Sequence, residues 1–413
     1  MGCRRVIPVR GQPWVVQLAV AVVAALLGIS ECSGRGSFIT AVPPTETQGI
    51  CATSVTIHGY KCQEFDVVTE DGYILSLQRI SDGRTGTGTG GNTEPVIIQH
   101  GILMDGMSWL LNSPERNLPM ILADNGFDVW IVNTRGTRFS RRHQSLDPSQ
   151  PEFWDWSWDE LVMYDLPAVC DFVYTRSGKR KTHYVGYSMG SLMALASLSE
   201  GKLVDKLKSV ALLGPIGYLS HMTTPLGIDA AKSYLGEVRV SAHKIGYINP
   251  VGQLLKLLCS QPGVDCYDLL SILTGNNCCL NSTTDSLALQ NLLQPTSTKN
   301  LLHFAQTVRD GRLTKYDYGI PGNLLIYGEV APPPYELSSI PKDIPMFVSY
   351  GGRDAISDPW DVQTLLHRLQ LHDVDKLSVQ FIEDYAHIDF IMGVNAKDVV
   401  YSQVLSFLTK LRS

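Results

Sequence analysis

The chain has 413 residues, of which 44% are hydrophobic and 18% are charged, and its net charge is −6 at pH 7. This length exceeds one minimal core and fits an enzyme domain that carries an insertion, and the composition excludes a disordered chain. The acidic balance argues against nucleic acid as a partner, because no basic stripe could neutralise successive phosphates.

Residues 1–34 have the pattern of a signal peptide. Three arginines precede an apolar run over residues 14–27, and small and polar residues follow at 30–34. The run is shorter than the roughly 20 apolar residues that cross a bilayer, so we expect cleavage rather than retention as an anchor. The mature chain would then have no stable transmembrane segment and would be secreted.

The cysteines agree with export. Cys51 and Cys62 lie close together and four others are clustered, which predicts disulfides whose pairing the sequence leaves open. Cys170 lies in an apolar, helix-like segment and is expected to be a buried free thiol. Asn281 begins an Asn-Ser-Thr glycosylation motif. The motif alone leaves open whether Asn281 carries a glycan. The clustered cysteines are Cys259, Cys266, Cys278 and Cys279.

After the leader, the sequence predicts a hairpin of two strands over residues 65–69 and 73–80, around Glu70-Asp71-Gly72. A Gly/Thr loop at 86–91 has the spacing Gly-x-Gly-x-x-Gly. We reject a dinucleotide site there, because a strand follows the glycines instead of the required helix.

Strands and helices then alternate, which predicts a parallel sheet with helices on both faces. Ser157 and Glu160 form a capping box that begins one helix, and Pro167 lies at a first-turn position of another. The expected strands cover residues 95–99, 127–132, 182–185, 345–350 and 377–382, and the expected helices cover 114–125, 191–199, 358–371 and the C-terminus.

The segment 215–331 differs in character, since it is helical, rich in leucine and without convincing strands. We expect an inserted helical cap that divides an α/β core into residues 35–214 and 332–413. Four leucines of this segment could line an acyl pocket or belong to an ordinary buried helix. They are Leu254, Leu255, Leu257 and Leu258. Four aromatic residues at and just before the start of the capped helix are expected to pack in the core. They are Phe153, Trp154, Trp156 and Trp158.

A Gly-x-Ser-x-Gly motif stands between the strand at 182–185 and the helix at 191–199. This is the pattern of a nucleophile elbow, in which the serine adopts a strained backbone conformation and the flanking glycines avoid a clash with neighbouring elements. The context predicts Ser188 as the nucleophile of an α/β-hydrolase fold. The motif reads Gly186, Tyr187, Ser188, Met189 and Gly190.

A serine hydroxyl needs a base within hydrogen-bond reach, and the base needs an acid that holds its tautomer. In this fold both residues follow the nucleophile. His387 comes directly after a strand, where catalytic groups gather in open parallel sheets, so we predict it as the general base. Two other histidines also follow the nucleophile, but their positions are less suitable. His367 lies inside a helical pattern, and His372 lies before the last strand instead of after it.

The acid is expected soon after the strand at 345–350. Asp354 follows that strand and a Gly-Gly turn, so we predict it as the orienting acid. Asp358 precedes Pro359, which is typical of a helix N-cap, and it remains the alternative.

The tetrahedral intermediate also needs two backbone N–H donors. We expect one from Met189, directly after the nucleophile, and one from the loop that begins at His100. Ile102 is the preferred donor in this loop, with Gly101 as the alternative. His100 precedes both the nucleophile and the acid in sequence, so we expect it to pack structurally.

With these motifs placed, the chain resembles the acid lipase family, which includes gastric and lysosomal acid lipases, and is most similar to its plant triacylglycerol lipase members. The blocks that carry the resemblance are residues 70–75, 99–103, 125–130, 133–137, 156–160, 186–190, 350–354 and 385–390.

The resemblance implies a serine lipase that cleaves long-chain triacylglycerols, or also steryl esters, at an oil or membrane interface, without a metal or an organic cofactor. It implies an extracellular or acidic, vacuole- or lysosome-like compartment. Carried over residue by residue, the family's triad falls on Ser188, Asp354 and His387, and its oxyanion donors fall on Ile102 and Met189.

Two departures and two alternatives stay open. The family usually has His where this chain has Tyr187, and the cap segment matches least well. A carboxylesterase, thioesterase or peptidase could use the same triad on smaller soluble substrates. A non-catalytic, ligand-binding scaffold would require a broken triad or oxyanion loop, and the sequence has neither.

Overall fold

The computed structural model describes residues 49–84, 93–224, 228, 247–248, 266–281 and 293–412. One mixed sheet runs through the molecule in the order β1-β2-β4-β3-β6-β7-β10-β11, and β5 pairs with β2. The described strands of this sheet are β1 (Lys61–Val68), β2 (Tyr73–Asp82), β3 (Glu94–Gln99), β4 (Phe127–Val132), β5 (Arg142–His143), β6 (Thr182–Tyr187), β7 (Leu207–Leu213), β10 (Met346–Gly351) and β11 (Leu377–Ile382).

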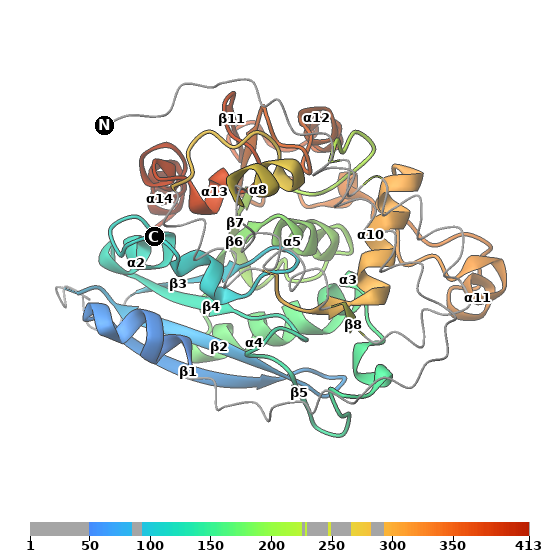
Figure 1. Cartoon of the computed structure of the whole chain (residues 1–413), viewed down its shortest axis with the longest axis horizontal. Coiled ribbons are helices and arrows are strands. Elements are labelled where there is room, and N and C mark those ends of the chain that lie inside the picture. The colour runs from blue at the N-terminus through green and yellow to red at the C-terminus, as the bar shows by residue number, and fades with distance from the viewer. Residues whose placement is uncertain are drawn as a thin grey trace.

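The predicted, mostly parallel sheet is confirmed. The six strands from β4 to β11 pair in parallel, whereas β1 and β2 form the expected antiparallel hairpin and β2 runs antiparallel to β4. The hairpin forms one edge of the sheet and β11 forms the other (Figure 1).

One central strand, β7, was not predicted from the sequence. Its residues Leu207–Leu213 lie between two parallel neighbours, and nearly all of them are buried. A strand covered on both faces carries no alternation of apolar and polar residues, so its short apolar run could not be told from a helix segment.

Two hydrophobic clusters fill the two faces of the sheet, because successive side chains of a strand point to opposite sides. Ile97 of β3 belongs to one cluster, whereas its neighbours Val96 and Ile98 belong to the other. The first cluster also receives side chains of α4, α5 and α12, and the second receives those of α2, α13 and α14. The described α-helices are α2 (Leu118–Asp124), α3 (Trp158–Glu160), α4 (Leu166–Arg176), α5 (Met189–Ser199), α8 (Cys266–Thr274), α10 (Thr298–Asp310), α11 (Gly319–Ile326), α12 (Pro359–Arg368), α13 (Asp389–Met392) and α14 (Ser402–Lys410).

Local capping signals set several helix starts. The capping box of Ser157 and Glu160 is present, and Asp358 caps α12 by accepting a hydrogen bond from the N–H of Trp360. The helix expected from residue 114 begins only at Leu118, since the side chain of Asn117 accepts a hydrogen bond from the N–H of Met120. The helices begun by the capping box and by Pro167 are one run, because π-helical turns over Leu161–Asp165 join α3 to α4.

Short π-helical and 3₁₀ turns connect the other elements. They are Cys51–Val55, Thr56–His58, Gly106–Leu110, Pro151–Trp154, Leu337–Ser339 and Lys397–Tyr401.

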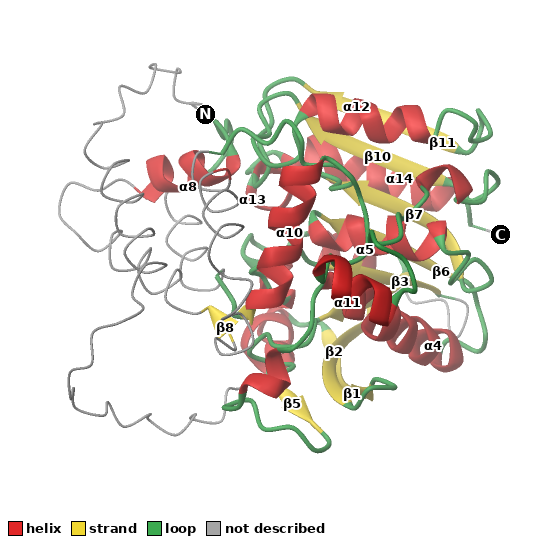
Figure 2. Cartoon of the chain, turned by 90° about the vertical axis from the view of Figure 1, so that its right-hand side faces the viewer, coloured by secondary structure: helices red, strands yellow, loops and turns green. Residues whose placement is uncertain are grey.

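Between β7 and β10, the described residues add no strand to the main sheet. They contain α8, α10, α11 and, contrary to expectation, a small antiparallel pair of β8 (Tyr247–Ile248) with β9 (Thr296–Ser297). Helices α8 and α10 lie, with α13, at one end of the sheet (Figure 2). The four leucines singled out in this segment and Cys259 lie outside the described residues.

The cysteine predictions can be compared with the structure in part. The predicted disulfides, whose pairing the sequence left open, join Cys51 to Cys62 and Cys278 to Cys279. Cys170 is buried and free, as predicted. The four aromatic residues around Trp156 are buried in the core, also as predicted. Within the described part of the chain, no helix is long and apolar enough to cross a membrane.

Candidate active site

The predicted nucleophile lies on a tight turn between β6 and α5. Ser188 follows the last residue of β6, and α5 begins at Met189. The backbone of Ser188 has φ 56° and ψ −118°, a conformation that costs a non-glycine residue free energy and persists only where the surrounding structure imposes it. Such strain is typical of a nucleophile elbow.

The two glycines of the motif are required by close packing. A Cβ at Gly186 would lie 2.6 Å from the carbonyl oxygen of Gly190, and a Cβ at Gly190 would lie 2.7 Å from the carbonyl oxygen of Gln99 on β3. Both obstacles are backbone atoms, which cannot rotate away as a flexible side chain could. The steric reason inferred from the sequence therefore applies here.

Substitution of Gly186 by alanine is expected to lower the free energy of unfolding by about 1–3 kcal/mol, because the added methyl group overpacks the turn. Denaturant unfolding would measure this loss. The matched control is Gly217→Ala, whose new Cβ would meet side-chain atoms of Leu365 at 3.4 Å and of Leu337 at 3.7 Å, both ordinary van der Waals distances. Equal stability of the two variants would contradict the steric argument.

The structure brings the three predicted triad residues together. Ser188 Oγ lies 2.9 Å from His387 Nε2, and His387 Nδ1 lies 2.8 Å from Asp354 Oδ2. All three side chains are almost fully buried. A carboxylate that accepts the Nδ1–H leaves the Nε2 lone pair of a neutral imidazole directed at the serine hydroxyl, so this arrangement can remove the hydroxyl proton.

Asp354 is held by its own loop after β10. Its Oδ1 accepts hydrogen bonds from the N–H groups of Ile356 at 2.9 Å and Ser357 at 2.8 Å, which leaves Oδ2 for His387. The alternative acid, Asp358, is instead occupied as the N-cap of α12.

The loop that carries His387 has a contact the sequence did not predict. The hydroxyl of Tyr187 donates a hydrogen bond of 3.0 Å to the backbone oxygen of His387, and the two rings lie 5.0 Å apart. Burial raises the pKa of Tyr187 well above its usual value, so the phenol keeps the proton it donates. Tyr187, the elbow residue that departs from the family pattern, therefore contacts the backbone of the predicted base. In the sequence, its position next to Ser188 was the one sign of a role at the site.

The loop predicted to supply an oxyanion donor lies against Ser188, the predicted nucleophile. A Cβ at Gly101 would lie 2.9 Å from the Cβ of Ser188, and Ile102 is the next residue of this loop. The second predicted donor, Met189, begins α5, so its N–H has no partner within that helix. Both predicted donors thus stand in segments that border Ser188.

His100 lies at the start of this loop, and both of its ring nitrogens form hydrogen bonds there. It is fully buried, and burial lowers its pKa to about 4. The neutral ring donates from Nδ1 to the Gly101 oxygen at 2.8 Å and accepts at Nε2 from the Thr134 N–H at 3.2 Å. Its structural role agrees with the sequence analysis.

One group in the described chain combines three side chains of metal-ligating types. Cys278, Cys279 and Asp389 place one atom each within 4.8 Å of one another. The two sulfur atoms are bonded to each other, so they offer no thiolates, which are the form in which cysteine binds metals. The residues do not fit a metal centre in this state.

Comparisons with known proteins agree with this geometry. Residues 51–113 match the family model described as a partial alpha/beta-hydrolase lipase region, and residues 94–239 match that of the alpha/beta hydrolase fold. The chain is 54% identical to triacylglycerol lipase 2 of Arabidopsis thaliana over 93% of its own length and 94% of the relative's. It is 32% identical to human gastric triacylglycerol lipase, over 86% and 90% of the two chains.

Solved structures resemble the chain at the level of the fold. A soluble variant of monoglyceride lipase from Saccharomyces cerevisiae matches with a TM-score of 0.52 and 16% identity, over 84% of this chain and 96% of that one. A carboxyl esterase from Bacillus coagulans matches with a TM-score of 0.53 and 14% identity, over 85% and 99%.

Proposed function

Since this chain belongs to the acid lipase family of α/β-hydrolases, we propose that it hydrolyses carboxylic esters of long-chain fatty acids, triacylglycerols above all, with Ser188 as nucleophile. The observation that carries the proposal is the hydrogen-bonded series Ser188, His387 and Asp354 on a strained elbow. The names and near full-length coverage of the relatives support triacylglycerol as the substrate. Steryl esters are a further substrate class of the same chemistry.

The reaction follows from the positions of these groups. Ser188 Oγ attacks the ester carbonyl carbon while His387 Nε2 takes the hydroxyl proton, and Asp354 stabilises the resulting imidazolium. The tetrahedral intermediate collapses when His387 returns the proton to the leaving alcohol, which frees a di- or monoacylglycerol and leaves an acyl-enzyme. Water then attacks this ester by the same sequence of steps and releases the fatty acid.

The developing oxyanion needs donors that are already in place. We assign this role to the backbone N–H groups of Ile102 and Met189. The contact of the Gly101 loop with Ser188 and the position of Met189 at the start of α5 support the assignment.

Residues 215–331 are proposed to form a cap over this site, between core segments 35–214 and 332–413. Three contacts from this segment to the catalytic loops support the proposal. The Thr274 oxygen accepts from the His387 N–H at 3.1 Å, the Gln294 N–H donates to the Leu103 oxygen at 2.8 Å, and Asn300 Nδ2 lies 3.8 Å from Met189 Sδ.

The proposed location is the extracellular space or a vacuole- or lysosome-like lumen, reached after removal of residues 1–34. The disulfide between Cys51 and Cys62 supports an oxidising compartment. Asn281 is exposed, as a glycosylated side chain must be. We expect the substrate to be met at an oil or membrane surface.

The deciding experiment is a hydrolysis panel with emulsified triolein, tributyrin, cholesteryl oleate, soluble p-nitrophenyl butyrate and an acyl thioester across pH. We expect turnover of emulsified triolein that the soluble substrates do not match. Activity on soluble esters alone would instead favour the carboxylesterase alternative. A protein that hydrolyses none of them and is not labelled by a fluorophosphonate would be a non-catalytic scaffold.

A further inference from the structure

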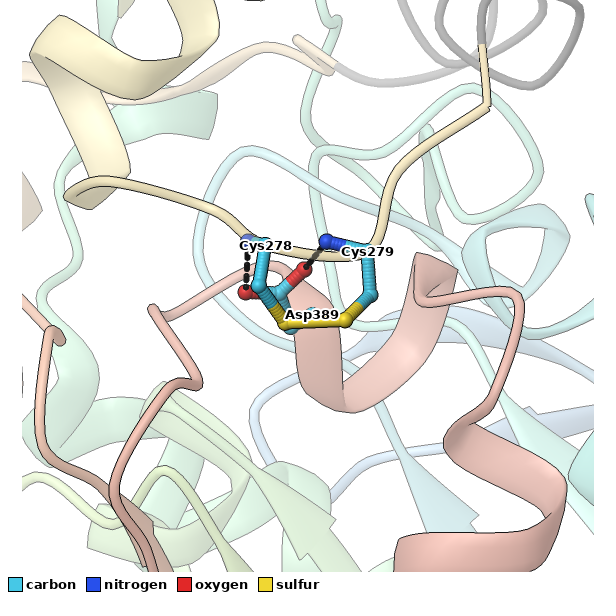
Figure 3. A group of neighbouring side chains, drawn as sticks. All are labelled: Cys278, Cys279 and Asp389. Carbon is cyan, nitrogen blue, oxygen red and sulfur yellow. Dashed lines mark hydrogen bonds between the residues drawn. A yellow bond between two sulfur atoms is a disulfide. The ribbon is translucent and has the colours of Figure 1, made fainter. Parts of the chain in front are cut away.

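The carboxylate of Asp389 lies fully buried two residues after His387, at the start of α13. Its Oδ2 accepts a hydrogen bond from the N–H of Ala386 at 2.8 Å. Oδ2 also accepts from the N–H of Cys278 at 3.1 Å, and Oδ1 accepts from the N–H of Cys279 at 3.1 Å (Figure 3). One side chain thus joins the loop of the proposed base to a segment about 110 residues earlier in the chain.

That earlier segment, residues 274–279, contacts both catalytic loops. The Thr274 oxygen accepts from the N–H of His387 at 3.1 Å and from that of Ala355 at 3.4 Å. Gly275 forms an isolated antiparallel bridge with Asp354. The segment therefore lies across the acid loop and the base loop and touches the backbone of each.

Its far end is attached near α13. The Cys279 oxygen accepts a hydrogen bond of 2.8 Å from the N–H of Val394. The N–H groups of Cys278 and Cys279 donate to Asp389, as described above. Three backbone donors converge on one carboxylate and favour its charged form, but burial outweighs them and raises the pKa of Asp389 to about 6. An amide in the same position could not replace it, because its NH₂ group would face an N–H donor.

These contacts depend on backbone N–H groups and not on sulfur. The disulfide between Cys278 and Cys279 leaves both N–H groups directed at Asp389 (Figure 3). Removal of the two sulfur atoms would leave the donors in place, whereas removal of the carboxylate would leave three backbone donors without their acceptor.

We propose that Asp389 is a positioning residue for His387: by holding residues 274–279 against the loop that carries the base, it keeps the imidazole between Ser188 and Asp354. The inference rests on the proposed function, because it assigns His387 the role of general base. A displacement of a catalytic group by about 1 Å can lower the rate about 100-fold. A loop that keeps His387 in place should therefore have a measurable effect on the rate.

The main test is Asp389→Asn in the full-length protein, with p-nitrophenyl butyrate as a soluble substrate. We expect kcat to fall about 10- to 100-fold while KM changes less than about threefold, since substrate contacts are untouched and the base is misplaced. The rate of Ser188 labelling by a fluorophosphonate should fall by a similar factor in protein that circular dichroism shows to be folded. Asp398→Asn, an exposed carboxylate on the same C-terminal part of the chain, is the matched control and should behave as the wild type.

Two further variants keep the inference testable if Asp389→Asn does not fold. Asn277→Ala removes side-chain hydrogen bonds to Thr274 and Gly275, and it should lower kcat with little change in KM. The double variant Cys278→Ala/Cys279→Ala keeps the backbone donors and should retain kcat within about threefold.

The outcomes separate the inference from the proposed function. If the wild type is labelled at Ser188 and folded Asp389→Asn is labelled equally fast, the positioning role is wrong although the function stands. A wild type that is neither labelled nor active would overturn the function first. Loss of activity in the cysteine double variant alone, with Asp389→Asn fully active, would assign the effect to sulfur and contradict the role of the carboxylate.

Discussion

Ser188→Ala should lower kcat for ester hydrolysis by on the order of 10⁴- to 10⁶-fold, because the nucleophilic oxygen is lost and only binding and the oxyanion donors remain. The fold should persist, since the turn is held by backbone atoms. The N–H of Ser188 donates to the Leu213 oxygen at 3.0 Å, and the oxygen of Ser188 accepts from the N–H of Ser191 at 2.9 Å. Alanine keeps both contacts.

The measurement combines initial rates on a soluble and an emulsified ester with mass spectrometry of the fluorophosphonate-labelled peptide. Ser199→Ala is a suitable control, since its hydroxyl bonds only within α5, to the Ala196 oxygen at 2.8 Å. Labelling of a different serine in the wild type, or turnover by Ser188→Ala close to that of the control, would refute the assignment of the nucleophile.

Asp354→Asn is expected to lower kcat by about 10⁴-fold with the structure preserved. The amide can donate to His387 Nδ1, which favours the tautomer with the proton on Nε2 and leaves no lone pair for the serine hydroxyl. The loop contacts of Asp354 with the N–H groups of Ile356 and Ser357 need only one oxygen, which asparagine also provides.

The matched control for this prediction is Asp358→Asn, because both residues lie on the loop between β10 and α12. Asparagine caps a helix about as well as aspartate, so stability and kcat should stay near the wild type. Rates are compared on p-nitrophenyl butyrate, and thermal unfolding verifies that both variants fold. If Asp358→Asn were the inactive variant of the two, the carboxylate that orients His387 would have been misassigned.

Local signals made much of this fold predictable. Ser157 with Glu160, and Asp358 with Pro359, each identify a helix start through side chains only a few residues away. The hairpin around Gly72 follows from its turn residues in the same way. Strand β7 was not predicted, because a strand buried on both faces lacks the alternation of apolar and polar residues by which strands are recognised in a sequence.

The sequence by itself determined the elbow, since the glycines at 186 and 190 on either side of the serine are required by steric contacts at that turn. It also gave the order of serine, acid and histidine that is typical of the α/β-hydrolase fold, and its sequence blocks carried the resemblance to the family. Only the tertiary structure decided which distant groups meet: Tyr187 reaches the oxygen of His387 from 200 residues away, and Asp389 receives the N–H groups of Cys278 and Cys279. Nearly all residues have backbone N–H and C=O groups. No side-chain pattern in the sequence therefore predicts which of these groups will meet at a given hydroxyl or carboxylate.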